Sequence, residues 1–318
     1  MVDDESVTVR SPTEWLRRLS GLRDLGGWVA AVVVLVGGCG LRGAGEPGGE
    51  VSAPPGPTYQ LQRVIEVEGR QGVATDGEQY FVSGSTALFV YSKTGELLLA
   101  NRDPFAAMET TANHIGDIDV DDGELFAGIE NFVDGRGTDI QVAIYDTETL
   151  EYRRSIEWDP ESGQVEVSAV TVDARNNAIW MTDWVNGRYL YRYDLDTGRY
   201  AGKLHLRPVP QWLQGITAYN GALLITADDG DADLDEADNL WQVSPDVEAT
   251  AAYVELEHSF TELRRAGEIE GVTVDEAAAE LVVLSNRGAR IVLGMPSGFY
   301  PGYDREIHEL YIYSIESP

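Results

Sequence analysis

Short runs of alternating hydrophobic and polar residues occupy most of the chain, from Tyr59 to Glu316. Turn residues such as Asp, Asn and Gly separate these runs, and the sequence shows no long helical periodicity. Alternation with a period of two is typical of β-strands whose two faces have different surroundings. The pattern therefore predicts an all-β domain over residues 59–316.

Two phrases repeat within this domain and divide it into units. The first reads as a short buried strand, and its copies begin 45, 52, 46 and 56 residues apart, at Gln71, Gly116, Ser168, Gln214 and Glu270. The second carries aromatic or other large apolar residues, and its copies begin at Leu88, Val142, Leu190, Leu240 and Leu310. Repeats of this length are typical of four-stranded blades. They predict a β-propeller with five counted blades, or six if one degenerate blade escapes the count.

The two ends of the domain complement each other. The fifth unit stops just after Ser314 and lacks a fourth strand, whereas residues 59–67 form a strand with no partner in the first unit. If this strand completes the last blade, the ring closes and two exposed strand edges disappear. We therefore expect the amino-terminal strand to belong to the carboxy-terminal blade.

The charge of the chain is strongly negative. It has 54 acidic and 23 basic residues, a net charge of −31, and only two lysines, Lys93 and Lys203. A surface this negative repels phosphate, which excludes nucleic acid as an expected partner. The excess has two interpretations, a set of acidic sites or adaptation to molar salt. Because the acids are spread from Asp3 to Glu316 without a single block, we favour salt adaptation and expect a halophilic source.

Residues 1–39 are predicted to be a targeting segment. A stretch with several arginines precedes a short apolar run at 28–36, which is far shorter than the roughly 20 residues of a membrane-spanning helix. The run ends in Gly-Gly-Cys and resembles a lipoprotein signal, with Cys39 as the lipid-attachment residue and the only cysteine of the chain. The alternative is a buried free thiol in a short helix. Residues 40–58 are a Gly/Pro linker, so we expect an extracytoplasmic domain tethered to the membrane.

The repeats also resemble a known superfamily at the level of single blades. The run Ala-Ile-Trp-Met-Thr-Asp-Trp at 178–184, and the strand at 188–194 that follows it, are similar to the blades of SMP-30/gluconolactonase-like and YWTD/NHL-type propellers. In the gluconolactonase-like enzymes a glutamate, asparagines and an aspartate hold a divalent metal at one mouth of the central channel. Glu270 matches the position of that glutamate, but in the last repeat, whereas the first repeat carries Gln71.

Several polar residues are expected to meet at the channel mouth, because inner strands begin and second strands end near the axis of a propeller. Carboxylates and amides are the oxygen ligands that Ca²⁺ and Mg²⁺ prefer. We predict that Ca²⁺ or another divalent metal is held by Glu270, Asp228, Asp183, Glu130, Asn131 and Asn286. Candidate catalytic residues are Asp228 or Glu270 as a base, and His114 as an acid, base or ligand. The alternative is that these side chains only bind turn amides and water.

The sequence leaves two functions open. The first is a lipid-anchored, extracytoplasmic propeller that binds a small ligand or a protein at its channel mouth. The second is a divalent-metal-dependent hydrolase of lactones or esters. The sequence contains no nucleophile elbow, P-loop or dinucleotide fingerprint in a suitable context. Whether the protein is an enzyme stays open at this point, and we favour binding.

Overall fold

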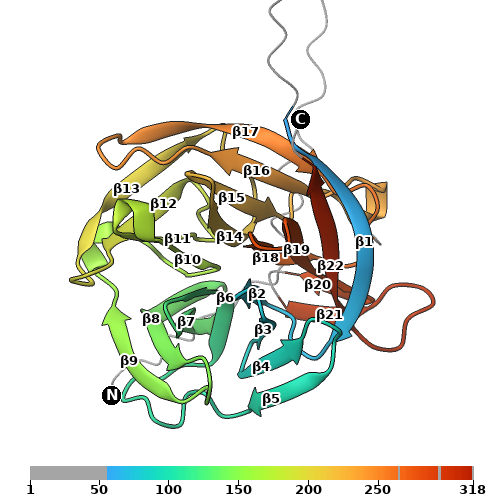
Figure 1. Ribbon diagram of the computed structural model, residues 1–318, viewed down its shortest axis with the longest axis horizontal. Helices are drawn as coiled ribbons and strands as arrows, with labels where there is room; N and C mark the ends of the chain where they lie inside the picture. The colour runs from blue at the N-terminus through green and yellow to red at the C-terminus, as the bar shows by residue number, and fades with distance from the viewer. Residues whose placement is uncertain (1–55, 264–265, 293–294, 317–318) are drawn as a thin grey trace, which may run out of the picture. The chain divides into compact units, whose positions relative to one another are not determined.

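The computed structural model describes residues 56–263, 266–292 and 295–316, in which 22 strands are arranged mainly as five four-stranded blades around one axis (Figure 1). The predicted targeting segment, the lipid-attachment residue Cys39 and most of the predicted linker lie outside the described residues. Within the described part of the chain, no helix is both long and apolar enough to cross a membrane. The predicted all-β propeller with five blades is confirmed.

Each blade is an antiparallel sheet whose first strand lies nearest the axis. The first blade consists of β2 (Gly72–Thr75), β3 (Gln79–Gly84), β4 (Ala87–Ser92) and β5 (Leu97–Asn101). The second consists of β6 (His114–Asp121), β7 (Glu124–Val133), β8 (Arg136–Asp146) and β9 (Tyr152–Glu157). The third consists of β10 (Val170–Asp173), β11 (Ala178–Met181), β12 (Tyr189–Asp194) and β13 (Tyr200–Arg207). The fourth consists of β14 (Leu213–Tyr219), β15 (Ala222–Ala227), β16 (Asn239–Val243) and β17 (Ala251–Ser259).

The last blade is built from both ends of the domain, as predicted. It contains β18 (Ile269–Asp275), β19 (Glu280–Arg287), β22 (Ile307–Glu316) and, as its outer strand, β1 (Thr58–Val67). Strand β1 runs antiparallel to β22, with Tyr59 opposite Ile315 and Val67 opposite His308. Figure 1 shows the blue first strand lying along the red last one. A hairpin of β20 (Ala289–Val292) and β21 (Met295–Phe299) is inserted between β19 and β22.

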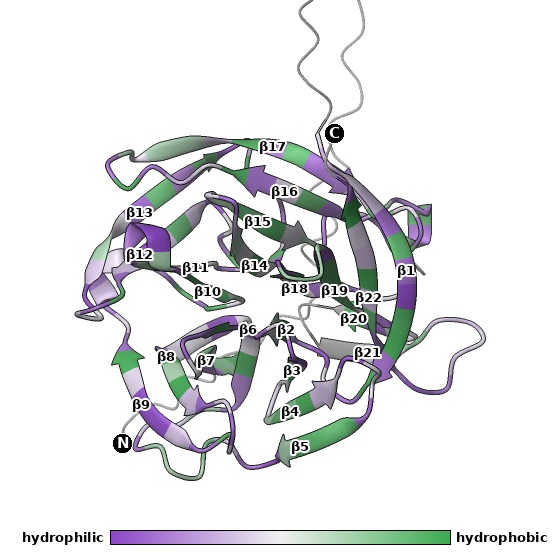
Figure 2. Ribbon diagram, in the orientation of Figure 1, coloured by the Kyte–Doolittle hydropathy of each residue, from purple (hydrophilic) through white to green (hydrophobic). Residues whose placement is uncertain are grey.

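The hydrophobic core lies between neighbouring blades. Because side chains alternate along a strand, each blade can present apolar residues to the blade on either side. Phe81 and Leu88 of the first blade pack with Ile118 and Leu125 of the second in one buried cluster. On an outer strand, one side faces solvent, so only the side chains on the other face can be buried. Figure 2 shows this alternation as purple and green segments along β1. The same packing of one blade against the next is repeated around the ring.

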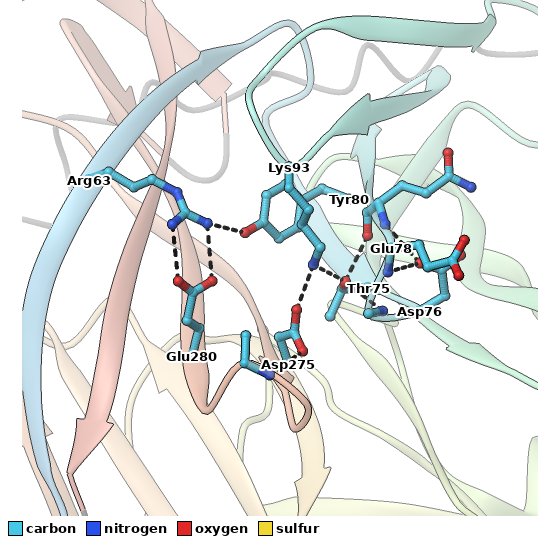
Figure 3. A network of polar contacts seen from close by, with 11 residues as sticks. Arg63, Thr75, Asp76, Glu78, Tyr80, Lys93, Asp275 and Glu280 are labelled. Carbon is cyan, nitrogen blue, oxygen red and sulfur yellow. Dashed lines mark hydrogen bonds and ion pairs between the residues drawn. The ribbon is translucent and has the colours of Figure 1, made fainter.

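Polar side chains join the last blade to the first (Figure 3). Arg63 of β1 donates to both carboxylate oxygens of Glu280 in β19 and to the Tyr80 hydroxyl in β3. Lys93 lies 3.9 Å from the centre of the Tyr80 ring and donates to Thr75 Oγ1 at 2.6 Å and to Asp275 Oδ2 at 2.8 Å. Asp275 is in β18, so these contacts reinforce the junction at which the ring closes.

Lys93→Met is expected to lower the free energy of unfolding by about 2 kcal/mol, because it leaves the buried Asp275 carboxylate without its cation. Burial acts to raise the pKa of Asp275, but the hydrogen bonds from Lys93 and Ala278 lower it overall. A carboxylate with a depressed pKa contributes stability at neutral pH and loses it in acid. The difference in melting temperature from the unmodified protein should therefore shrink below about pH 4. Arg102→Met, which breaks the exposed pair with Glu68, is the control; an equal loss there would contradict the prediction.

Candidate functional site

Asp117 of β6 fills the centre of the ring. Its Oδ1 accepts the backbone N–H of Val73 at 2.9 Å, and its Oδ2 accepts those of Ile216 at 3.1 Å and Val272 at 3.3 Å. The side chain is fully buried, and burial raises its pKa although these hydrogen bonds oppose the rise. Three inner strands are thereby bound to one carboxylate. The axis is closed at this level, so the two mouths of the propeller do not form an open channel here.

The glycine of the inner-strand phrase has a steric role at this level. A Cβ atom on Gly271 would collide with Asp117 Oδ1, and one on Gly72 would lie 2.5 Å from Asp117 Cα. These strands therefore approach the axis more closely than a side chain would allow.

A cavity of about 310 Å³ opens at the mouth where the inner strands begin. Four of the five predicted inner-strand positions, Gln71, Ser168, Gln214 and Glu270, line it together. The remaining inner-strand position, Gly116 of the second blade, does not line the cavity, and residues close to it in that blade form the wall instead. All five blades contribute, the remaining lining residues being Arg70, Ser85, Asn113, His114, Phe132, Glu166, Trp184 and Glu268. The predicted convergence of polar side chains at this mouth is present in the structure.

Arg70 organises the acidic residues on one side of the cavity. Its guanidinium lies 3.3 Å from Glu268, 3.8 Å from Glu270 and 3.2 Å from Glu306. Asn286 Nδ2 donates to Glu270 Oε1 at 2.7 Å. Burial and the neighbouring carboxylates raise the pKa of Glu268 and of Glu270, and Arg70 opposes that rise. This group, which we call the Arg70 cluster, thus contains its own cation.

A second acidic group lies on another part of the wall, and we call it the His114 cluster. His114 Nδ1 is 3.2 Å from Glu130 Oε1, while Glu130 Oε2 accepts the N–H of Val167 at 3.0 Å. Glu166 Oε2 accepts the N–H of Trp184 at 2.6 Å. Ligand atoms of His114, Glu130 and Glu166 all lie within 4.8 Å of one another. Burial, followed by the charges of Glu130 and Asp183, raises the pKa of Glu166 well above its ordinary range.

The six predicted metal ligands do not lie together, and only three of them, Glu130, Glu270 and Asn286, belong to these two clusters. Glu270 and Asn286 are in the Arg70 cluster, and Asp228 is close to Glu268, whose charge, after burial, raises the pKa of Asp228. Glu130 is in the His114 cluster, and Asp183 adjoins it. Asn131 instead donates to Thr138 Oγ1 on the neighbouring strand β8. The six residues therefore do not surround a single position.

Two tryptophans stand at the edge of the cavity. The ring centroids of Trp184 and Trp212 are 4.7 Å apart and their planes are inclined by 37°. Trp184 lines the cavity, and Trp212 is 40% exposed. A large aromatic surface thus adjoins a cavity whose lining includes three acidic residues, Glu166, Glu268 and Glu270.

The opposite mouth has a different character. A wider cavity of about 580 Å³ is lined there by the far ends of the inner strands and by turn carboxylates such as Asp76, Asp121 and Glu276. Asp119 accepts hydrogen bonds from Thr171 Oγ1 and Val172 N, and burial raises its pKa to about 6. These carboxylates include groups that fasten strands and turns, and no aromatic side chain lines this cavity among the described residues.

Comparison with known proteins does not place the chain in a family. No protein-family model and no curated protein matches the sequence. The structure is similar to a chain of Kuenenia stuttgartiensis hydrazine synthase, with a TM-score of 0.41 and 9% identity over 77% of this chain and 62% of that one. It is also similar to a chain of the mitotic checkpoint complex, with a TM-score of 0.42 and 11% identity over 91% of this chain and 100% of that one. This chain thus spans less than two thirds of the hydrazine synthase chain, and these similarities carry no functional information.

Proposed function

We propose that this propeller binds a small polar ligand in the cavity at the mouth where the inner strands begin. The observation that carries the proposal is the cavity itself, which all five blades line and which Asp117 closes along the axis. Its volume of about 310 Å³ falls at the lower end of the range typical of small-molecule sites. A rigid ring that presents converging donors and acceptors requires little reorganisation on binding.

The lining residues indicate the chemistry of the ligand. Gln71, Ser168 and Gln214 offer neutral donors and acceptors, and the buried glutamates disfavour an anion. Trp184 offers an apolar face for stacking. A sugar, a polyol or a small organic cation matches this combination better than a protein segment does, because the cavity volume is only about 310 Å³.

The cellular location of the protein remains a prediction from the sequence. In this proposal the protein is tethered outside the cytoplasm by a lipid attached to Cys39, and its surface is adapted to molar salt. Mass spectrometry of the amino-terminal peptide would test whether Cys39 carries a lipid.

Ligand binding can be tested by thermal unfolding of the full-length protein in molar salt, against a panel of sugars, polyols, amines and lactones. A ligand at about 100 times its dissociation constant should raise the melting temperature by about 5 °C or more. Trp184→Ala should abolish this shift and the accompanying change in tryptophan fluorescence. Tyr253→Ala removes a ring that is 82% exposed on β17 and should change neither. A shift that survives in Trp184→Ala would argue against this cavity.

Metal-dependent hydrolysis of a lactone or ester is the second candidate, and the His114 cluster is the observation that favours it. In such a reaction, water adds to the carbonyl carbon, the acyl C–O bond breaks, and the leaving oxygen takes a proton. The metal would be held by the His114 cluster, of which His114 and Glu166 line the cavity, whereas Asp228, one of the bases predicted from the sequence, does not line it. Glu270, the other base predicted from the sequence, is engaged by Arg70 and Asn286.

A further inference from the structure

We infer that His114, Glu130 and Glu166 form a site for a divalent transition-metal ion such as Zn²⁺ or Mn²⁺. This inference rests on the proposed function, since the ion would occupy the wall of the same cavity and form part of the ligand site. Of these three residues, Glu130 belongs to the ligand set predicted from the sequence and His114 was predicted as an acid, base or ligand, whereas Glu166 was not predicted.

The spacing of the donor atoms fits one ion. Two ligands of the same zinc or manganese ion lie about 3.0–3.4 Å apart when each is about 2.1 Å from the metal. His114 Nδ1 and Glu130 Oε1 are 3.2 Å apart, and the donor set as a whole lies within 4.8 Å. A small movement of the Glu166 side chain would complete a three-residue set.

Glu166 also has a free coordinating oxygen. The residue is only 2% exposed and lines the cavity, yet its only side-chain hydrogen bond to a described residue is the one that Oε2 accepts from Trp184 N. Oε1 therefore has no partner in the described part of the chain. Because Glu166 lines the cavity, this oxygen is available to coordinate a cation that enters there.

The charges of the two clusters support the same conclusion. The Arg70 cluster contains a guanidinium, whereas no lysine or arginine among the described residues pairs with Glu130, Glu166 or Asp183. Asp183 is held by the N–H groups of Val165 and Asn186, so it adds negative charge near the proposed ion without being free to move. A divalent cation would compensate the charge that no lysine or arginine compensates.

The donor set also indicates which ion would bind. One imidazole nitrogen and two carboxylates suit Zn²⁺, Mn²⁺ or Fe²⁺, whereas Ca²⁺ prefers six to eight oxygen ligands. Three protein ligands would leave a coordination position open toward the cavity, as in sites where a metal meets a ligand or a water molecule. The sequence predicted Ca²⁺ or another divalent metal, and this donor set favours a transition metal over Ca²⁺.

The test uses full-length protein in molar salt after removal of metal with a chelator. Zn²⁺ and Mn²⁺ binding is measured by equilibrium dialysis with elemental analysis, and Co²⁺ binding by its visible spectrum. We expect about one tightly bound ion per chain, and a loss of affinity of about 100-fold or more in His114→Ala and in Glu166→Gln. Glu268→Gln is the matched control, because it alters an equally buried carboxylate on the same cavity that is already paired with Arg70.

Binding that is weak, or equal in all three variants, would overturn the site, as would tighter binding of Ca²⁺ than of Zn²⁺. Melting temperatures of the variants, measured without metal, ensure that a loss of binding does not reflect unfolding. The panel of organic ligands is then repeated in chelator. Organic binding without metal binding would overturn the metal site alone, whereas metal binding without organic binding would leave the metal site standing and count against the proposed function.

Discussion

Asp117→Ala is expected to lower the free energy of unfolding by about 3–5 kcal/mol, one of the two largest effects of a single substitution that we predict. The change removes both acceptors from three backbone N–H groups, of Val73, Ile216 and Val272, which lie in a region closed to water. Each unsatisfied buried group costs about 1–3 kcal/mol, and the costs are not fully additive. The loss is large compared with the usual total stability of about 5–15 kcal/mol.

Urea unfolding at constant molar salt is the measurement. Asp117→Asn keeps the shape and one acceptor oxygen, so it should cost less and remain folded if the alanine variant does not. Asp76→Ala is the control, because Asp76 also accepts two backbone N–H groups, of Glu78 and Gln79, but in an exposed turn where water can replace it. A loss at Asp117 no greater than that at Asp76 would show that the carboxylate does not hold the inner strands together.

The blades were predictable because each copy of the repeat carries the same local signals. The prediction that residues 59–67 complete the last blade followed from counting the strands of the last unit. In the structure β1 pairs with β22, as this prediction requires. The parallel pairing of β13 with β17, which joins the outer edges of two blades, had no counterpart in the repeat. This pairing depends on the distance between the outer strands of two neighbouring blades. Tertiary packing sets that distance, and the local sequence pattern does not.

The candidate site was only partly predictable. The inner-strand starts Gln71, Ser168, Gln214 and Glu270 do meet, because equivalent positions in a ring must converge. The sequence reasoning missed Glu166, Glu268 and Arg70. Glu166 and Glu268 each stand two residues before a phrase, the offset that His114 has from Gly116. Side chains two residues apart share a face of an extended chain, so this offset was a usable signal. The pairing of Arg70 with three glutamates could not be predicted, because it joins residues about 200 positions apart.

Arg70→Met is expected to cost about 3–5 kcal/mol at neutral pH, because it leaves Glu268, Glu270 and Glu306 clustered without their cation. Such clusters are buried enough that molar salt screens them poorly. Arg70→Lys should recover part of the loss, since it restores the charge but not the planar fork of donors. Arg305→Met, which breaks an exposed pair with Glu66, should have a much smaller effect.

The pH dependence separates lost charge compensation from lost packing. Without Arg70, the pKa values of Glu268 and Glu270, already raised by burial, rise further. A carboxyl group with a raised pKa in the folded state is most favourable when protonated, and its burial costs more as the pH rises through that value. The gap in melting temperature between the variant and the unmodified protein should therefore narrow as the pH falls from about 8 to about 5. A gap that stays constant over this range would mean that Arg70 stabilises the wall of the cavity by packing and not by its charge.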